Sequence, residues 1–224
     1  MVLYIDGYKI KDKGHNGVFY EGNAIREIYC GSTLIYKNWF YQHNEKVFES
    51  NVSTTTTLTI KEDGDYNIWC IGGGGGGSNG TGGAGAGVNL ITRLVAGTYT
   101  IVIGAGGAGA GAYVRNNDGK NGTDSSITGN GCSIIAGGGI RRRGRRNGGG
   151  GGETGTLQYS NTQPITIIER TTDGEVTNIS LLTKDTSGAG AGGLNQPNDT
   201  GAGYAGKDGY IKITAAKLFG GQTD

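Results

Sequence analysis

Hydrophobic and polar positions alternate over short runs through the N-terminal part of the chain, which is the pattern of β-strands. The runs occupy residues 2–5, 8–10, 18–20, 24–30 and 34–37. An Asp6-Gly7 pair between the first two runs is a strong signal for a tight hairpin. We therefore predict a meander of about four strands, which has too little apolar surface to be very stable alone. Residues 1–45 are assigned to this module, which we expect to dock on a larger partner.

An aromatic cluster and a second pair of runs follow the module. Trp39, Phe40 and Tyr41 could form a core plug between two modules or an exposed anchor at an interface, and both interpretations stay open. Residues 54–60 are mostly β-branched and favour an extended strand. A turn at residues 62–65 should reverse the chain into residues 66–71. The pattern predicts that these two strands pair as a hairpin.

Beyond residue 71, clusters of glycine alternate with ordinary strand patterns. The clusters lie at residues 72–87, 104–111, 137–139, 148–152, 188–193 and 201–209. Strand patterns lie at residues 88–91, 99–103, 133–135, 165–168, 179–182 and 210–213. A flexible linker would not be interrupted so regularly by Ile, Val and Thr, so we expect the glycine runs to be ordered.

Order in a glycine run must come from backbone hydrogen bonds and close packing, because glycine has no side chain to bury. Left-handed helices with three residues per turn let neighbouring backbones approach closely, and the Gly-Ala alternation of residues 82–87 and 188–193 suits them. The predicted fold class is all-β. It comprises the small N-terminal β-module and, over residues 46–219, a glycine-rich β-sandwich continuous with a bundle of polyglycine-II-like helices.

Composition removes several classes of protein. Glycine makes up 48 of the 224 residues, yet two prolines and a formal net charge of +1 fit neither a disordered linker nor collagen. No apolar run approaches the ~20 residues of a membrane span, and the first residues do not resemble a secretory signal. We expect a soluble protein made in the cytoplasm, with no membrane partner. Cys30, Cys70 and Cys132 are expected to be buried, reduced thiols.

Motifs that would indicate catalysis or a cofactor fail on their context. Residues 104–109 fit a dinucleotide-binding pattern, but a loop rather than a helix is predicted after them. Residues 201–207 fit a phosphate-binding loop, but Asp208 stands where a serine or threonine would ligate magnesium. His15 and His43 have no acidic or cysteine partner at metal-ligand spacing. We therefore expect no enzyme activity, no cofactor and no metal.

Three stretches carry a resemblance to a known family: residues 64–75 with the entry into the glycines, residues 95–107 (VAGTYTIVIGAGG) and residues 206–213 (GKDGYIKI). Together they resemble the glycine-rich domain of bacteriophage tail proteins and adhesins, over about residues 50–215. A related domain occurs in receptors of the anaplastic lymphoma kinase type. Residues 25–37 look like a short β-module of phage tail and baseplate proteins. The resemblance implies a virion structural or receptor-binding role, with glycine helices as a rigid scaffold and the loops as contact surface.

Loops between glycine clusters are the candidate contact sites, since they carry polar, charged or aromatic groups. The arginine-rich residues 141–146 could be a solvated loop, a contact for an anionic polysaccharide or protein, or a nucleic-acid contact, the last disfavoured because the chain lacks a broad basic face. The predicted contact residues are Tyr113, Arg115, Arg141, Arg142, Arg143, Arg145, Arg146, Asn195 and Asn198. The predicted docking residues are Ile28, Tyr29, Leu34, Tyr36 and Trp39.

The sequence therefore predicts a bacteriophage virion protein of the tail or fibre, which docks by its N-terminal module and presents the glycine-rich domain for host attachment. Its partners would be other virion proteins and a host surface polysaccharide or protein, without nucleic acid, and it would be located in the virion. The alternative is a purely structural cement, baseplate or head-associated protein with no host ligand. Whether it forms a homo-oligomer is left open, because no heptad repeat indicates one.

Overall fold

In the computed structural model, the described part of the chain is all-β, with two antiparallel five-stranded sheets and no helix. This confirms the predicted fold class at that level. The structure describes residues 3–5, 8–10, 18–20, 23–25, 27–30, 32–37, 44–77, 82–110, 119–141, 155–170 and 203–217. The predicted strand at residues 179–182 lies outside them.

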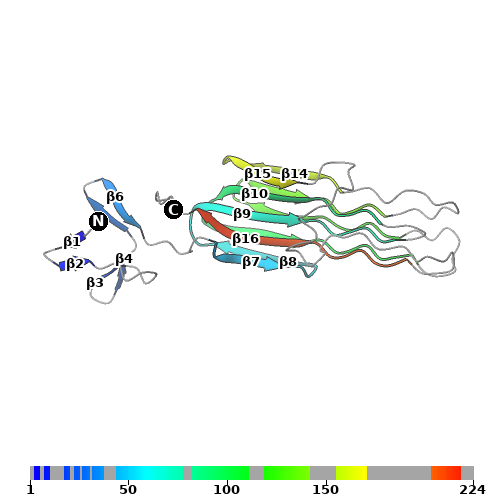
Figure 1. Cartoon of the computed structure of the whole chain (residues 1–224), viewed down its shortest axis with the longest axis horizontal. Helices are drawn as coiled ribbons and strands as arrows, with labels where there is room; N and C mark the ends of the chain where they lie inside the picture. Colours follow the sequence, from blue (N-terminus) through cyan, green and yellow to red (C-terminus); the bar gives the residue numbers. More distant parts are fainter. Residues whose placement is uncertain are drawn as a thin grey trace.

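The two five-stranded sheets face each other as a sandwich (Figure 1). Sheet I has the order β15-β10-β9-β16-β7, formed by Ile165–Arg170, Gly87–Leu94, Gly64–Ile71, Tyr210–Lys217 and Lys46–Ser50. Sheet II has the order β14-β13-β12-β11-β8, formed by Leu157–Asn161, Cys132–Ala136, Ser125–Gly129, Gly97–Ile103 and Thr54–Ile60. Every neighbouring pair of strands within both sheets is antiparallel.

The core lies between the two sheets and follows the alternation of the strands. In β9 every second side chain is fully buried, including Tyr66, Ile68 and Cys70. The same period of two places Ile101 of β11 and Ile134 of β13 in the core from the other sheet. One face of each sheet is therefore apolar, and burying the two faces against each other stabilises the sandwich.

The predicted hairpin between residues 54–60 and 66–71 is wrong, although both strands are present as β8 and β9. β8 pairs with β11 in sheet II, whereas β9 pairs with β10 and β16 in sheet I. The residues between them carry the chain from one sheet to the other. The physical reason is that the inward side chains of both strands, such as Ile60 and Ile68, are buried in the same inter-sheet core.

The N-terminal strands form three separate two-stranded sheets rather than one meander of about four strands. The six strands are β1 (Leu3–Ile5), β2 (Tyr8–Ile10), β3 (Val18–Tyr20), β4 (Asn23–Ile25), β5 (Glu27–Cys30) and β6 (Thr33–Lys37). Among the described residues, β1 pairs only with β2, β3 only with β4 and β5 only with β6. The pairing of β1 with β2 confirms the hairpin around Asp6-Gly7. Turn signals at short intervals therefore end each pairing after one hairpin.

Glycine-rich segments continue from the sandwich strands without a break and extend past one end of both sheets (Figure 1). We call these six segments, residues 72–77, 82–86, 104–110, 119–124, 137–141 and 203–209, the glycine bundle. The expectation that the glycine runs are ordered is therefore confirmed for the described segments.

Candidate functional site

Residues 72–77 form the centre of the glycine bundle. Their six backbone N–H groups donate in turn to three neighbouring segments, residues 82–86, 119–124 and 203–209. The first three N–H groups reach the three segments in this order, and the next three reach them in the same order. The bonds are Gly72 to Ala86, Gly73 to Thr123, Gly74 to Lys207, Gly75 to Gly83, Gly76 to Lys120 and Gly77 to Tyr204, all with N···O distances of 2.8–3.0 Å. A repeat of three differs from a β-ladder, in which a strand bonds to neighbours on two sides only.

Two further segments donate to the central one. Gly107 and Ala110 donate to the carbonyls of Gly74 and Gly77, and Gly139 donates to the carbonyl of Gly73. The neighbours also bond to one another, which fixes their order around residues 72–77. That order is 203–209, 104–110, 119–124, 137–141 and 82–86, each bonded to the next.

Close approach of these backbones explains why so many positions are glycine. A Cβ atom added at Gly73 would meet the Ala105 carbonyl oxygen, and one added at Gly76 would meet the Ala108 carbonyl oxygen, both far inside van der Waals contact. The obstacle in each case is backbone, which cannot rotate away as a flexible side chain could. The bundle thus depends on glycine at particular positions.

Polar side chains accept hydrogen bonds from backbone N–H groups where the strands continue into the glycine bundle. Asp208 accepts the N–H of Gly106 at 2.8 Å and the N–H of Ser53 at 3.1 Å. The hydroxyls of Ser125 and Thr123 accept the N–H groups of Gly104 and Ala105 at 2.9 and 2.7 Å. These side chains take the place of strand partners at the junction, so the backbone stays paired through the change of geometry.

Several described residues that border the predicted contact loops lie toward one end of the glycine bundle, whereas Gly155, the next described residue after the arginine-rich loop, donates to Ala84 and is followed by Thr156, which accepts from Gly137 next to β13. Ala110 donates to Gly77 and accepts from Gly203, which brings three chain positions together at the end farthest from the sandwich. Gly83 donates to Ile140 nearby, and Arg141 donates its N–H to Asn121 Oδ1 at 2.8 Å. Arg141 is the one predicted contact residue within the described part. Tyr113, Arg115, Arg142, Arg143, Arg145, Arg146, Asn195 and Asn198 lie outside it, so their contact role stays a prediction.

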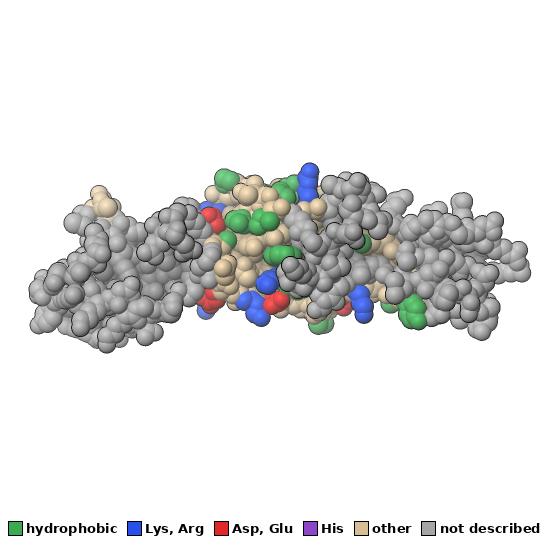
Figure 2. All heavy atoms as spheres, in the orientation of Figure 1, with side chains coloured by type: hydrophobic (Ala, Val, Ile, Leu, Met, Phe, Trp, Pro, Cys, Tyr) green, Lys and Arg blue, Asp and Glu red, His purple; other side chains and the backbone are tan. Residues whose placement is uncertain are grey.

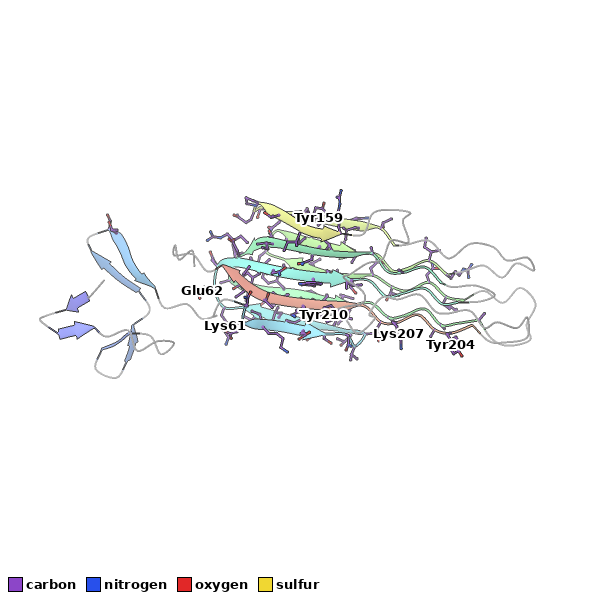
Figure 3. The ribbon with its side chains drawn as sticks, in the orientation of Figure 1. Lys61, Glu62, Tyr159, Tyr204, Lys207 and Tyr210 are labelled. Atoms are coloured by element: carbon purple, nitrogen blue, oxygen red, sulfur yellow. The ribbon has the colours of Figure 1, made fainter. Side chains whose placement is uncertain are left out.

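Two exposed apolar side chains near this end were not predicted as contacts. Tyr204 is 53% exposed and Ile140 is 38% exposed, and Tyr204, Lys207 and Tyr210 succeed one another along the segment that leads into β16 (Figure 3). The signal was present in the sequence, because a bulky residue inside a run of Gly and Ala can only point outward. On the face drawn in Figure 2, the described charged side chains of both signs are interspersed, without a patch of one sign.

The predicted docking residues lie in the N-terminal hairpins. Ile28 and Tyr29 are on β5 and Leu34 and Tyr36 are on β6, while Trp39 lies outside the described residues. Their docking role stays a prediction. The chain first contacts the sandwich just before β7. The Asn44 N–H donates to the Ala215 carbonyl at 2.7 Å, at the end of β16 away from the glycine bundle.

Titratable groups of the described residues form no metal site, because no cluster of three or more His, Cys, Asp or Glu side chains occurs there. Burial raises the pKa of the Cys70 thiol to about 12 and that of Cys132 to about 11. At the edge of sheet I, hydrogen bonds from the Tyr210 hydroxyl (2.6 Å) and Lys46 lower the pKa of Glu49. Among the described residues, no helix could cross a membrane.

A β-sandwich with a hydrogen-bonded glycine bundle defines the class of glycine-rich β proteins. A family model described as a glycine-rich domain matches residues 50–224, and the chain belongs to this family. The resemblance read from the sequence is confirmed to that extent. No curated protein matches the sequence.

Proposed function

We propose that the glycine bundle is a polyglycine-II lattice of threefold helices. The observation that supports this is the repeat of three in the donors of residues 72–77, since a helix with three residues per turn turns successive N–H groups by 120°. Glycine at the closest contacts fits the same geometry. Protection of the Gly72–77 amides from hydrogen exchange, equal to that of β9, is the expected result, and fast exchange of two in every three amides would contradict the lattice.

We further propose that the protein is a structural component of a bacteriophage tail or fibre that contacts the host surface through the distal end of the bundle. The observation that carries this proposal is the convergence of the loop-flanking residues Gly77, Ala110, Arg141 and Gly203 at one end of a rigid, glycine-built support. Loops held together on such a support are preorganised for binding, which reduces the entropy lost on contact.

Attachment to the particle would be made by the N-terminal module, residues 1–45. Asn44 meets the sandwich at the end opposite the bundle, so a particle bound to the module leaves the distal end of the bundle outermost. The sandwich between them would serve as a spacer. Arginine side chains in the distal loop suit carboxylate or phosphate groups of a host polysaccharide or protein.

Immunogold labelling of purified particles tests the location. An antibody raised against the glycine-rich domain should label a fibre or tail tip. Labelling of the head or collar, or of no part of intact particles, would contradict the attachment role and favour a purely structural protein.

Charge substitutions test the contact. A triple change of Arg142, Arg143 and Arg145 to serine should reduce phage adsorption at least tenfold, while the thermal unfolding temperature of the isolated protein stays unchanged. The matched control replaces Lys46, Lys61 and Arg170 on the sandwich with serine, which removes the same charge. Equal adsorption by both variants would remove this loop from the proposal.

A further inference from the structure

The two sheets of the sandwich differ in charge. Every strand of sheet I contains at least one charged residue, whereas the five strands of sheet II contain none. The register of sheet II also aligns hydroxyl side chains across all five strands, in the row Thr57, Thr100, Thr128, Ser133 and Ser160. These residues alternate with core residues, so they face away from sheet I. Sheet II therefore has an uncharged, hydroxyl-rich outer face.

β8 is the edge of this uncharged sheet. Among the described strands it ends the order of sheet II, and it pairs with β11 over all seven of its residues without a register shift. Ile60 faces the core and is buried. Thr55, Thr57 and Thr59 lie on the opposite face and are exposed. An edge strand of this kind directs alternate backbone N–H and C=O groups away from its own sheet, where they can pair with another strand.

Each of the other three edge strands has a feature that hinders pairing with another chain. β7 and β15 both have a register shift against the inner strand, and both contain charged residues, with an ion pair between Lys46 and Glu49 on β7. β14 has five residues, and the Arg170 guanidinium donates to Tyr159 on it, which places a charge beside that edge. Proteins commonly protect sheet edges with bulges, charges and short strands. β8 has none of these features.

The sequence of β8 suits pairing with itself. Two identical antiparallel strands are related by a two-fold axis, and an axis at Thr57 is the one that pairs all seven residues of β8. Thr57 then lies opposite Thr57 of the second copy, and Thr55 lies opposite Thr59, so the outer face contains Thr–Thr pairs alone. Such pairs stabilise a sheet, and no like charges meet. The axis is perpendicular to the sheet, so the outer faces of both copies lie on the same side and sheet II continues through the pair.

We propose that β8 is an interface for a second copy of this chain, and that the two copies pair through an antiparallel β8–β8 contact. An edge without charge favours the second copy over a charged partner, because burying an unpaired charge is costly. One strand pair is a smaller contact than a permanent dimer interface, so the dimer should dissociate on dilution. Each glycine bundle continues along the strand direction, so the two bundles would extend in opposite directions (Figure 1). The contact therefore belongs to the free protein, and the proposed attachment to a particle does not depend on it.

Analytical ultracentrifugation of the full chain tests the dimer. The mass should rise toward twice that of the chain as the concentration increases. Thr57→Lys places two like charges opposite each other at the axis and should weaken the dimer at least tenfold. The matched control, Thr100→Lys, adds the same charge to an exposed position in the same row, one strand in from the edge, and should leave the dimer nearly unchanged. A monomer at every concentration, a dimer that Thr57→Lys does not weaken, or an equal loss in both variants would overturn the proposal.

A cysteine at the axis gives a second readout that does not depend on the stability of Thr57→Lys. In the full chain carrying Cys30→Ser, Thr57→Cys should form a disulfide between two copies under mild oxidation, because residues directly opposite each other are the closest cross-strand neighbours. Thr59→Cys is the matched control: it faces Thr55 of the second copy, so it should cross-link much less, and adding Thr55→Cys should restore the bond. No cross-link from Thr57→Cys, or equal cross-linking by Thr57→Cys and Thr59→Cys, would overturn the assigned pairing.

Discussion

Single glycines decide whether the bundle can form. We predict that Gly76→Ala destabilises the protein by about 3 kcal/mol or more, because the new methyl group meets the Ala108 carbonyl rather than a side chain that can move. Ala108→Ser, which adds one atom to an exposed position, should change stability by less than ~0.5 kcal/mol. Denaturant unfolding followed by tryptophan fluorescence measures both. Equal stabilities would mean that the backbones are not in contact.

Two buried thiols should be inert in the native protein. Iodoacetamide at pH 8 should leave Cys70 and Cys132 unmodified until the protein is unfolded, because burial raises the pKa of both thiols. Rapid alkylation of the folded protein would show that the core between the sheets opens. Peptide mapping distinguishes these two thiols from Cys30.

The same thiols make stability depend on alkaline pH. The ordinary pKa is 9.0 and the native value of Cys70 is about 12, so the unfolded state loses its proton first. Their contribution is complete below pH 9 and is lost as pH rises toward 12; burial of Tyr99 raises its pKa too and acts in the same direction. Urea midpoints should therefore fall between pH 8 and pH 10.5. A constant midpoint would contradict this.

At the scale of elements, two of the passages from one sheet to the other, β8 to β9 and β10 to β11, are each held by a tyrosine. The Tyr66 hydroxyl donates to the Glu62 carbonyl at 2.7 Å, and the Tyr99 hydroxyl donates to the Val95 carbonyl at 3.0 Å, each four residues back. Tyr66→Phe and Tyr99→Phe should each cost about 1 kcal/mol, measured by calorimetry. The double variant should cost the sum, because the two bonds lie at separate crossovers. A loss much larger than the sum would contradict independent roles.

The junction between sheet and bundle should depend on Asp208. Asp208→Ala leaves the N–H groups of Gly106 and Ser53 without their acceptor and should cost about 2 kcal/mol in denaturant unfolding. Asp208→Asn keeps one carbonyl acceptor and should cost less. Lys207→Ala, at the exposed neighbouring position, is the control and should have little effect. If Asp208→Ala destabilised the protein no more than Lys207→Ala, water would replace the carboxylate as the acceptor of these N–H groups.

At the scale of the whole molecule, the sandwich and bundle should fold without the N-terminal module, because both sheets of the sandwich consist of strands from β7 onward, and Val47 is the first core side chain among those that the structure describes. A fragment of residues 41–224 should melt within a few degrees of the full chain in calorimetry. A fragment starting at residue 51 loses β7, which uncovers the edge of β16 and removes Phe48 from the core surface. It should melt lower by about 4–8 °C. A full-chain melting temperature for the shorter fragment would contradict the role of β7.

Local patterns predicted the strands more reliably than their partners. The runs at residues 54–60, 66–71, 88–91, 99–103, 133–135, 165–168 and 210–213 all lie in strands. β12 was missed, although Asn130-Gly131 signals its two-residue turn to β13, and both residues have the positive φ that such a turn needs. β7 was missed because its two apolar residues, Val47 and Phe48, are adjacent and do not alternate with polar ones. The hydrogen bonds that join Ala110 to Gly77 and to Gly203 had no local signal.

The sequence by itself determined the all-β class, most of the strands and the fact that the described glycine runs are ordered and held by backbone contacts. Each of these follows from periodicity or from the absence of side chains over a few residues. Only the tertiary structure decided which sheet each strand joins, the repeat of three neighbours around residues 72–77 and the meeting of Gly77, Ala110 and Gly203 at one end of the bundle. Those features depend on hydrogen bonds and packing between residues far apart in the chain, which a local pattern does not encode.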